Sequence, residues 1–233
     1  MLISVHMPKT AGNSFLSGLT QRFGERLLQV YFLRPISSSA EDRINRAKYR
    51  CKLFFTGRDI TKRYDAIHGH FTADTFNRIP GPKQYCMFLR EPADRTISHY
   101  LFWLEQDALL TREGLPKPYN SVRRKFLKNR LGLNEFAELP EMVNFFSIYL
   151  GKMRIEDFDF IGLQEEYSTS LRLFERIFGL KIEESHENPT SKASRADLLS
   201  RIDLGRLRTA QSANQLIYDQ ARKRFDQLCA RYL

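Results

Sequence analysis

The sequence predicts an α/β fold in which a central parallel sheet is flanked by helices. Short apolar runs alternate with segments of helical periodicity, the pattern of parallel sheets. Polar segments follow several of these runs directly, and ligands of such sheets bind beyond the carboxyl ends of the strands. With 233 residues, 42% of them hydrophobic and 27% charged, the chain fits one domain over residues 1–233.

Five apolar runs are the predicted strands, the third of them running into a loop: residues 2–5, 27–33, 64–71, 84–89 and 158–163. Helical spacing predicts helices that begin near residue 13 or 14 and at Pro92. Further helices are expected over 142–150, over 171–178 and from about residue 210 to the end. Residues 41–52 fit an exposed helix or a loop, 111–130 an irregular excursion followed by a basic helix, and 185–195 a polar loop.

The loop after the first predicted strand has the composition of a phosphate-binding loop. The N–H groups of a first helical turn lack partners within the helix, and the helix dipole favours an anion there. One lysine and several small or hydroxyl-bearing residues surround this turn: Lys9, Thr10, Ala11, Gly12, Asn13 and Ser14. The loop is not a Walker motif, because its lysine precedes its only glycine. A βα turn with a solvated lysine is the alternative.

A second polar segment follows the predicted strand over residues 84–89. Arg90 stands at the strand end, and Ser98 lies two turns into the next helix. An arginine there can bind two oxygens of one phosphate, and the serine can reach the same pocket. An ion pair of Arg90 with Glu91 or Asp94 is the alternative.

His68-Gly69-His70 lies at a third strand end. Residues two apart on a strand point the same way, so both imidazoles can face one cleft. One of them can act as a general base. The alternatives are two structural histidines or a metal pair, and no third ligand of a suitable kind lies nearby in the sequence.

His6 to Phe15, His-Met-Pro-Lys-Thr-Ala-Gly-Asn-Ser-Phe, resembles the 5′-phosphosulfate loop of sulfotransferases that use PAPS (3′-phosphoadenosine-5′-phosphosulfate). Asn13 stands where many members have threonine. The spacing of Arg90 and Ser98 is similar to the family's 3′-phosphate site, and His-Gly-His resembles a segment of the heparan sulfate 2-O-sulfotransferase in the carbohydrate-modifying branch.

The resemblance implies a P-loop-NTPase-like sheet and transfer of a sulfonate to a hydroxyl, most readily of a saccharide, with adenosine 3′,5′-bisphosphate as product. Residues 9–14, Arg90 and Ser98 would bind PAPS, Lys9 would stabilise the leaving oxygen, and His70, or next His68, would be the base. Lys192 and Arg195 are candidate contacts in a loop that the family closes over the cofactor. No metal is expected, because the family works without one.

The formal charge of +10 implies an anionic partner. PAPS fits, an anionic saccharide also fits, and no recognisable nucleic-acid-binding motif is present. Three scattered cysteines favour a reducing compartment. No apolar run approaches the ~20 residues of a membrane span. A cytoplasmic, bacterial-type enzyme is therefore expected, unless the chain has been trimmed of an N-terminal Golgi anchor.

Three other functions remain open at this point. The acceptor can be a small molecule or a protein tyrosine rather than a saccharide. A nucleotide kinase or NTPase could use Lys9, although such enzymes usually need acidic groups for Mg²⁺ and the strand over 84–89 ends in Arg90. A non-catalytic anion-binding protein is the third.

Overall fold

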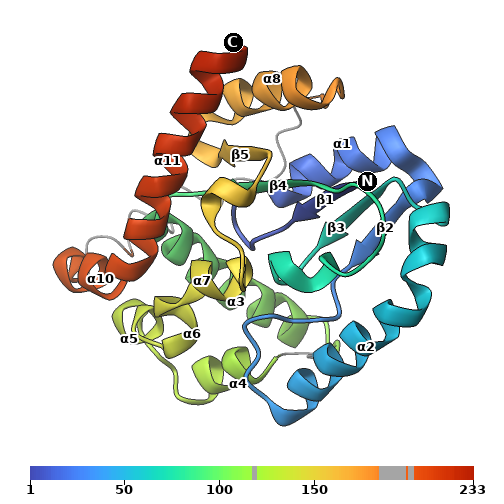
Figure 1. Ribbon diagram of the computed structural model, residues 1–233. Helices are drawn as coiled ribbons and strands as arrows, with labels where there is room; N and C mark the ends of the chain where they lie inside the picture. The colour runs from blue at the N-terminus through green and yellow to red at the C-terminus, as the bar shows by residue number, and fades with distance from the viewer. Residues whose placement is uncertain (117–119, 184–197, 199–201) are drawn as a thin grey trace.

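The centre of the protein is a sheet of five parallel strands. The computed structural model describes residues 1–116, 120–183, 198 and 202–233. The strands are β1 (Leu2–Val5), β2 (Leu27–Val30), β3 (Ala66–Gly69), β4 (Gln84–Leu89) and β5 (Phe160–Leu163), in the order β2-β3-β1-β4-β5 (Figure 1). All four neighbouring pairs are parallel, so the predicted α/β class with a central parallel sheet is confirmed.

β1 occupies the middle of this sheet, between β3 and β4. Its register pairs Ser4 with His68 on one side and with Cys86 on the other. All four residues of β1 are buried, as are all four of β3 and β5. Burial on both faces explains why these strands are continuous apolar runs rather than alternating ones. The chain segments that leave β3, β1 and β4 therefore emerge side by side at one edge.

Helices α1 (Gly12–Phe23) and α8 (Tyr167–Phe178) cover one face of the sheet. They meet through aromatic rings: Phe15 lies 4.9 Å from Phe88 of β4 and 5.1 Å from Phe174 of α8, between ring centroids. Gly179 closes α8 in a left-handed conformation, as the sequence predicts for that end. This aromatic packing fixes the start of α1 relative to β4.

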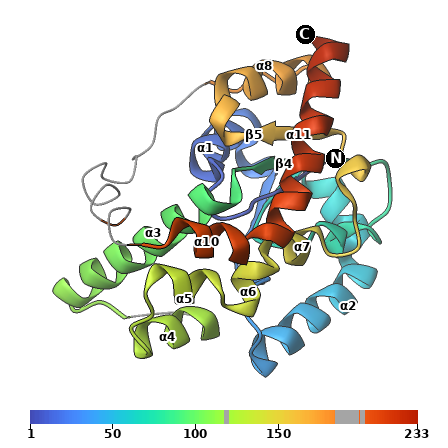
Figure 2. The same ribbon diagram turned by 90° about the vertical axis from the view of Figure 1, so that its left-hand side faces the viewer.

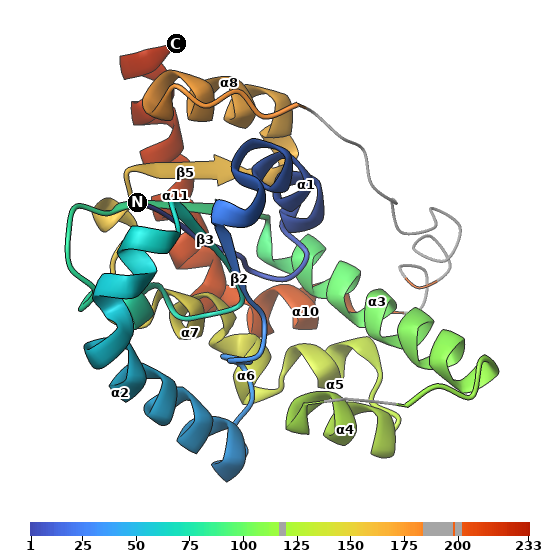
Figure 3. The same cartoon turned by 90° about the vertical axis from the view of Figure 1, so that its right-hand side faces the viewer.

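The remaining long helices enclose the rest of the sheet. α3 (Pro92–Arg112) begins beyond β4, and α11 (Ser212–Tyr232) packs along β5 and contacts α7, α8 and α3. α3 and α7 lie on the side of the sheet away from α1 and α8 (Figures 1 and 2). α2 (Ala40–Arg63) runs along the outside of the molecule (Figure 3).

Short elements complete the described chain. The α-helices are α4 (Ser121–Lys128), α5 (Leu133–Ala137), α6 (Pro140–Val143), α7 (Phe145–Leu150) and α10 (Leu204–Ala210). The 3₁₀ turns are η1 (Gly24–Arg26), η2 (Ala73–Phe76), η3 (Ile155–Asp157) and η4 (Gln164–Glu166).

Several predicted elements differ from the observed ones in extent; β5 begins at Phe160 rather than at residue 158, and α8 begins at Tyr167 rather than at residue 171. The second strand ends at Val30 rather than at residue 33, because the chain turns away there, with Phe32 56% exposed and Arg34 at a positive φ of 44°. The helix predicted over 142–150 is two helices, α6 and α7, separated at Asn144 by non-helical dihedrals. Residues 41–52 belong to the helix α2, which settles the choice between helix and loop.

In the part of the chain that the structure describes, no helix combines the length and the apolar character that crossing a bilayer requires.

Candidate functional site

The segment between β1 and α1 takes an unusual backbone path. Lys9 and Ala11 have positive φ angles of 72° and 67°, with Thr10 between them at negative φ. A left-handed conformation costs a non-glycine residue about 1–2 kcal/mol, so neighbouring contacts must hold the loop. The buried Thr10 supplies one, because its hydroxyl donates to the Met7 carbonyl at 2.9 Å. Such alternation turns backbone N–H groups inward, an arrangement that binds anions.

The first turn of α1 leaves its backbone donors open. Ala11 is the N-cap residue, and no side chain caps the helix. Within the described residues, no backbone carbonyl accepts a hydrogen bond from the N–H of Gly12, Asn13 or Ser14. Asn13 is exposed, whereas Gly12 and Ser14 are buried. The helix dipole adds a favourable field for negative charge at these donors.

The Lys9 side chain reaches from this loop to α3. Its Nζ lies 4.4 Å from the ring centroid of Phe102. Burial lowers the pKa of Lys9, repulsion from Arg90 lowers it further, and attraction to Glu105 raises it. Ser98 lies one turn before Phe102 on α3. The loop lysine and the two predicted 3′-phosphate residues therefore gather around one segment of α3.

Arg90 comes directly after the last residue of β4, next to β1 in the sheet. Its Nη2 lies 3.8 Å from Asp94 Oδ2, so the ion pair that the sequence left open is present. The Asp94 side chain is 42% exposed, and exposed ion pairs contribute about 0–1 kcal/mol. Ser98 is buried on the same helix. The Arg90 side chain is 18% exposed, so the ion pair is partly buried.

Three histidines form one cluster at the ends of β1 and β3. The His6 ring centroid lies 5.0 Å from that of His68, stacked, and 4.5 Å from that of His70. The Tyr31 hydroxyl is 3.2 Å from His6 Nδ1, and the Tyr31 ring is 4.7 Å from His70. The sequence did not single out His6 as a site residue. It joins the cluster because β1 and β3 are neighbours in the sheet.

The hydrogen bonds of the cluster fix one tautomer. His70 Nδ1 lies 2.8 Å from the His6 carbonyl oxygen, which can only accept, so Nδ1 carries the proton. His70 Nε2 is therefore the basic nitrogen. His68 Nδ1 pairs with Ser4 Oγ at 2.8 Å, and only 1% of His68 is exposed. His70 is half-buried, and so it is the histidine of the pair that an acceptor can reach.

Burial keeps the whole cluster neutral. It lowers the pKa of His70 to about 4, against an opposing effect of the hydrogen bond to the His6 backbone. Burial, with repulsion from His70, lowers the pKa of His68 to about 3. The pKa of His6 also falls well below its usual value through burial, then through repulsion from His70, His68 and Lys9. At neutral pH each ring has a nitrogen free to accept a proton.

Arg95 is a cation of α3 that lies fully inside the protein. It is 0% exposed, and no carboxylate pairs with it in the described chain. Nη1 lies 3.1 Å from His99 Nδ1, Nη2 donates to Thr96 Oγ1 at 2.9 Å, and the guanidinium carbon is 3.7 Å from the Phe145 centroid. Burial lowers the pKa of Arg95 to about 9, so it remains charged at neutral pH.

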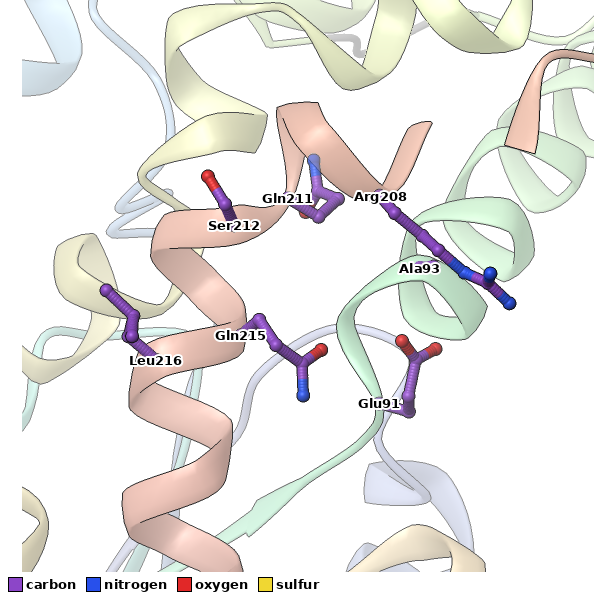
Figure 4. A pocket seen from close by; sticks show the side chains of 7 residues that line it. All are labelled: Glu91, Ala93, Arg208, Gln211, Ser212, Gln215 and Leu216. Carbon is purple, nitrogen blue, oxygen red and sulfur yellow. The ribbon is translucent and has the colours of Figure 1, made fainter. Parts of the chain in front are cut away.

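A cavity of about 540 Å³ is lined by Glu91, the residue that follows Arg90. The start of α3 lines one side through Glu91 and Ala93, and α10 and α11 line the other (Figure 4). Arg208, Gln211, Ser212, Gln215 and Leu216 complete its lining. It combines one carboxylate and one guanidinium with amides and apolar carbon, a mixture suited to an uncharged heterocycle with hydrogen-bonding edges.

A second cavity of about 290 Å³ is strongly basic. Three arginines of α2, Arg43, Arg46 and Arg50, line it with Thr72 and Thr75 of the segment after β3 and two other residues. Repulsion from Arg43 and Arg50 contributes to the lowered pKa of Arg46, whose largest cause is burial. Arg50 also donates to Asp74, at 2.8 Å. Thr72, one of the lining residues, comes two positions after His70, so the cavity and the histidine cluster are neighbours in the sequence.

The described residues bring together most of the predicted site. The loop residues 9–14, Arg90 and Ser98 lie at the ends of β1 and β4, and His68 and His70 at the end of β3. Lys192 and Arg195 lie outside the described residues. Among the residues that are described, no three His, Cys, Asp or Glu side chains group as ligands for a metal ion.

The fold and the site define a class: an α/β protein with a five-stranded parallel sheet and a basic, histidine-containing centre at the carboxyl edge of that sheet. No protein-family model and no curated protein matches this sequence.

Proposed function

We propose that this protein is a PAPS-dependent sulfotransferase that moves a sulfonate to the hydroxyl of a saccharide. The observation that carries the proposal is that Lys9 and Arg90 lie on the segments that leave two adjacent strands, β1 and β4, at the same edge of the sheet. Repulsion from Arg90 contributes, after burial, to the lowered pKa of Lys9. Two cations so placed, with open N–H groups at the start of α1, favour a ligand that carries two anionic groups.

The proposed donor site divides between two neighbouring strand ends. In a P-loop-like arrangement, the N–H groups of Gly12, Asn13 and Ser14 would hold the 5′-phosphosulfate together with Lys9. Arg90 and Ser98 would hold the 3′-phosphate. The cavity lined by Glu91 would receive the adenine, whose ring edges match amide side chains.

The chain's own residues suffice for an in-line transfer. PAPS, when bound, supplies the sulfonate. The acceptor oxygen attacks sulfur while His70 Nε2 takes the hydroxyl proton, which requires the neutral tautomer set by the His6 carbonyl. The bond from sulfur to the phosphate oxygen breaks, and Lys9 stabilises the charge on that oxygen. The products are a sulfate ester and adenosine 3′,5′-bisphosphate.

The basic cavity of α2 supports an acceptor that carries an anionic group. Its arginines lie on the β3 side of the site, next along the chain to His70. A carboxylate or sulfate on the saccharide would relieve the repulsion that contributes to the lowered pKa of Arg46. A neutral phenol or a protein tyrosine would bring no anionic group to these arginines.

Nucleotide titration tests the donor site. The protein should bind adenosine 3′,5′-bisphosphate at least tenfold more tightly than AMP, without Mg²⁺. Arg90→Ala should weaken binding of the bisphosphate about 10–100-fold, and Ser98→Ala by less, because hydrogen bonds to charged groups contribute about 1.5–3 kcal/mol. Arg78→Ala, an exposed arginine before the start of β4, is the matched control and should have no effect. Equal affinity for AMP would exclude the proposed site.

Transfer of labelled sulfate from PAPS to a panel of glycans tests the reaction itself. Anionic glycans should be labelled before neutral ones, phenols and tyrosine peptides. Phosphoryl transfer from ATP that depends on Mg²⁺ would instead identify a nucleotide kinase. Tight binding of the bisphosphate with no transfer to any acceptor would identify an anion-binding protein.

A further inference from the structure

Helix α2 presents an outward face that packs on nothing in the described chain. Only Leu53 and Gly57 of its 24 residues are buried. Residues spaced four and three apart share a helix face, and six exposed residues of α2 follow that spacing: Ile44, Lys48, Cys51, Phe55, Arg58 and Lys62. We call these six residues and the adjacent Phe54 the outer face of α2. Phe54 lies at its border, four residues after Arg50, which lines the basic cavity.

The outer face carries two adjacent phenylalanines, Phe55 within the row of six and Phe54 at its border. Phe54 is 73% exposed and Phe55 is 80% exposed, more than any other large hydrophobic residue among those described. Their ring centroids lie 5.4 Å apart, edge to face, and neither ring contacts another ring within the described residues. Ile44, 52% exposed, lies three turns earlier. Exposed aromatic pairs of this kind mark interaction sites rather than ordinary surface.

Positive charge surrounds these rings. α2 contains eight basic and three acidic residues. Lys48, Arg58 and Lys62 of the outer face form no ion pair in the part of the chain that is described, nor does the neighbouring Lys52. A second copy of the chain is a poor occupant, because two such faces would repel each other. The partner must therefore be anionic and must also accept apolar rings.

We infer that the outer face of α2 binds a lipid bilayer that carries anionic headgroups. A helix that lies in a bilayer interface inserts aromatic and aliphatic side chains between headgroups and keeps Lys and Arg at the phosphates. Basic residues near an anionic leaflet strengthen this attachment, and salt screens their contribution. This attachment does not depend on the proposed sulfotransferase activity.

Cys51 provides a direct probe, because it is exposed on the outer face, one turn before Phe55. Cys86 is buried, and Cys229→Ser removes the remaining partly exposed thiol. An environment-sensitive fluorophore on Cys51 of the full chain should shift to the blue with phosphatidylcholine vesicles that contain phosphatidylserine. It should not shift with phosphatidylcholine alone, and high salt should reverse the shift. No shift with either vesicle would overturn the proposal.

Paired variants separate the rings from the charge, with vesicle co-sedimentation as the readout. Phe54→Ser/Phe55→Ser should weaken binding about tenfold, whereas Leu216→Ser, which removes an exposed leucine from α11, should not. Lys48→Glu/Lys62→Glu should abolish binding, whereas the same reversal on α4, Lys125→Glu/Lys128→Glu, should not. Circular dichroism checks that each variant is folded.

Three results would contradict the assignment. One is equal loss in the α2 and α4 charge variants, which would indicate attraction by net charge alone. Another is tight binding of an RNA or DNA oligonucleotide that the Phe54→Ser/Phe55→Ser variant loses, without vesicle binding. The third is a dimer in sedimentation that the same variant dissociates, again without vesicle binding.

Discussion

The imidazole of His6 occupies the space that a side chain on Gly12 would need. A Cβ atom on Gly12 would lie 1.7 Å from His6 Nε2. Gly12 does not have positive φ, so its need for glycine comes from this contact rather than from its backbone conformation. The phosphate-loop candidate and the histidine cluster are thereby packed directly against each other.

Gly12→Ala should therefore destabilise the protein by about 1–3 kcal/mol, the usual range for overpacking. The cost should largely disappear in a His6→Ala background, since the ring that clashes is then absent. Denaturant unfolding measures the free energies. Gly132→Ala is the control, because the nearest atom there belongs to the movable end of Glu135. An equal cost of Gly12→Ala in both backgrounds would show that the ring is not the obstacle.

His70→Asn should lower turnover about 10²–10⁴-fold, the range for loss of a general base, and leave binding of adenosine 3′,5′-bisphosphate unchanged. Because burial lowers the pKa of His70 to about 4, His70 in the wild-type protein should remain neutral down to about pH 5. The pH profile of kcat/KM should thus have no acid limb near 6.5. An acid limb near 6.5 that His70→Asn removes would show that His70 is solvated in the working enzyme.

Stability should fall as the pH is lowered from about 6.5 to 5. Unfolded histidines take up protons below 6.5, whereas folded His68 and His70, with pKa values of about 3 and about 4, do not. The unfolding free energy should therefore decrease by up to about 1.4 kcal/mol per pH unit for each histidine. Chemical denaturation at several pH values gives the slope. His70→Asn should reduce the slope of unfolding free energy against pH by the contribution of one histidine. An unchanged slope would contradict the lowered pKa of His70.

Ala11→Gly should stabilise the protein by about 0.5–1 kcal/mol. Glycine at this position relieves the strain of a left-handed conformation, which costs alanine about 1–2 kcal/mol. It also increases the conformational entropy of the unfolded chain, which lowers the unfolding free energy by about 0.4–1 kcal/mol. Ala47→Gly, in the interior of α2, is the control and should lower the unfolding free energy by about 1 kcal/mol. Thermal unfolding of both variants distinguishes these outcomes. Destabilisation by Ala11→Gly would mean that the Ala11 methyl group makes a packing contact worth more than the strain.

Arg95→Met should be far better tolerated than Arg95→Ala. Methionine nearly fills the buried space and removes a desolvated charge that has no carboxylate partner in the described chain. Alanine leaves a cavity, which costs about 2–5 kcal/mol for a long buried side chain. The measurement is the difference in unfolding free energy between the two variants. Equal losses would assign the stability to the guanidinium and its contacts with His99 and Thr96.

The strands were the most predictable part of the fold. Leu2–Val5 and Gln84–Leu89 are found at the predicted residues, because strands buried on both faces are continuous apolar runs. The same apolar pattern made the predicted second strand too long, because Leu33 is also buried but lies in a turn outside the sheet. The sequence did not decide between a helix and a loop for the first part of α2, because only two of its 24 residues are buried and the helical periodicity is therefore weak.

The candidate site was predictable where a residue follows a strand. Arg90 and His70 are such residues, and parallel topology alone puts them at one edge. The role of His6 could not be predicted, because its ring contacts and the bond from its carbonyl to His70 depend on the order β3-β1. The burial of Arg95, with no carboxylate partner in the described chain, could not be predicted either, because its neighbours in the sequence of α3 are polar.

The sheet order has a practical consequence for redesign. β1 separates the strand that ends in Arg90 from the strand that ends in the histidines, and the arginines of α2 belong to the histidine flank. If the protein is the proposed sulfotransferase, changes confined to α2 and the segment after β3 should alter acceptor preference and leave nucleotide affinity unchanged.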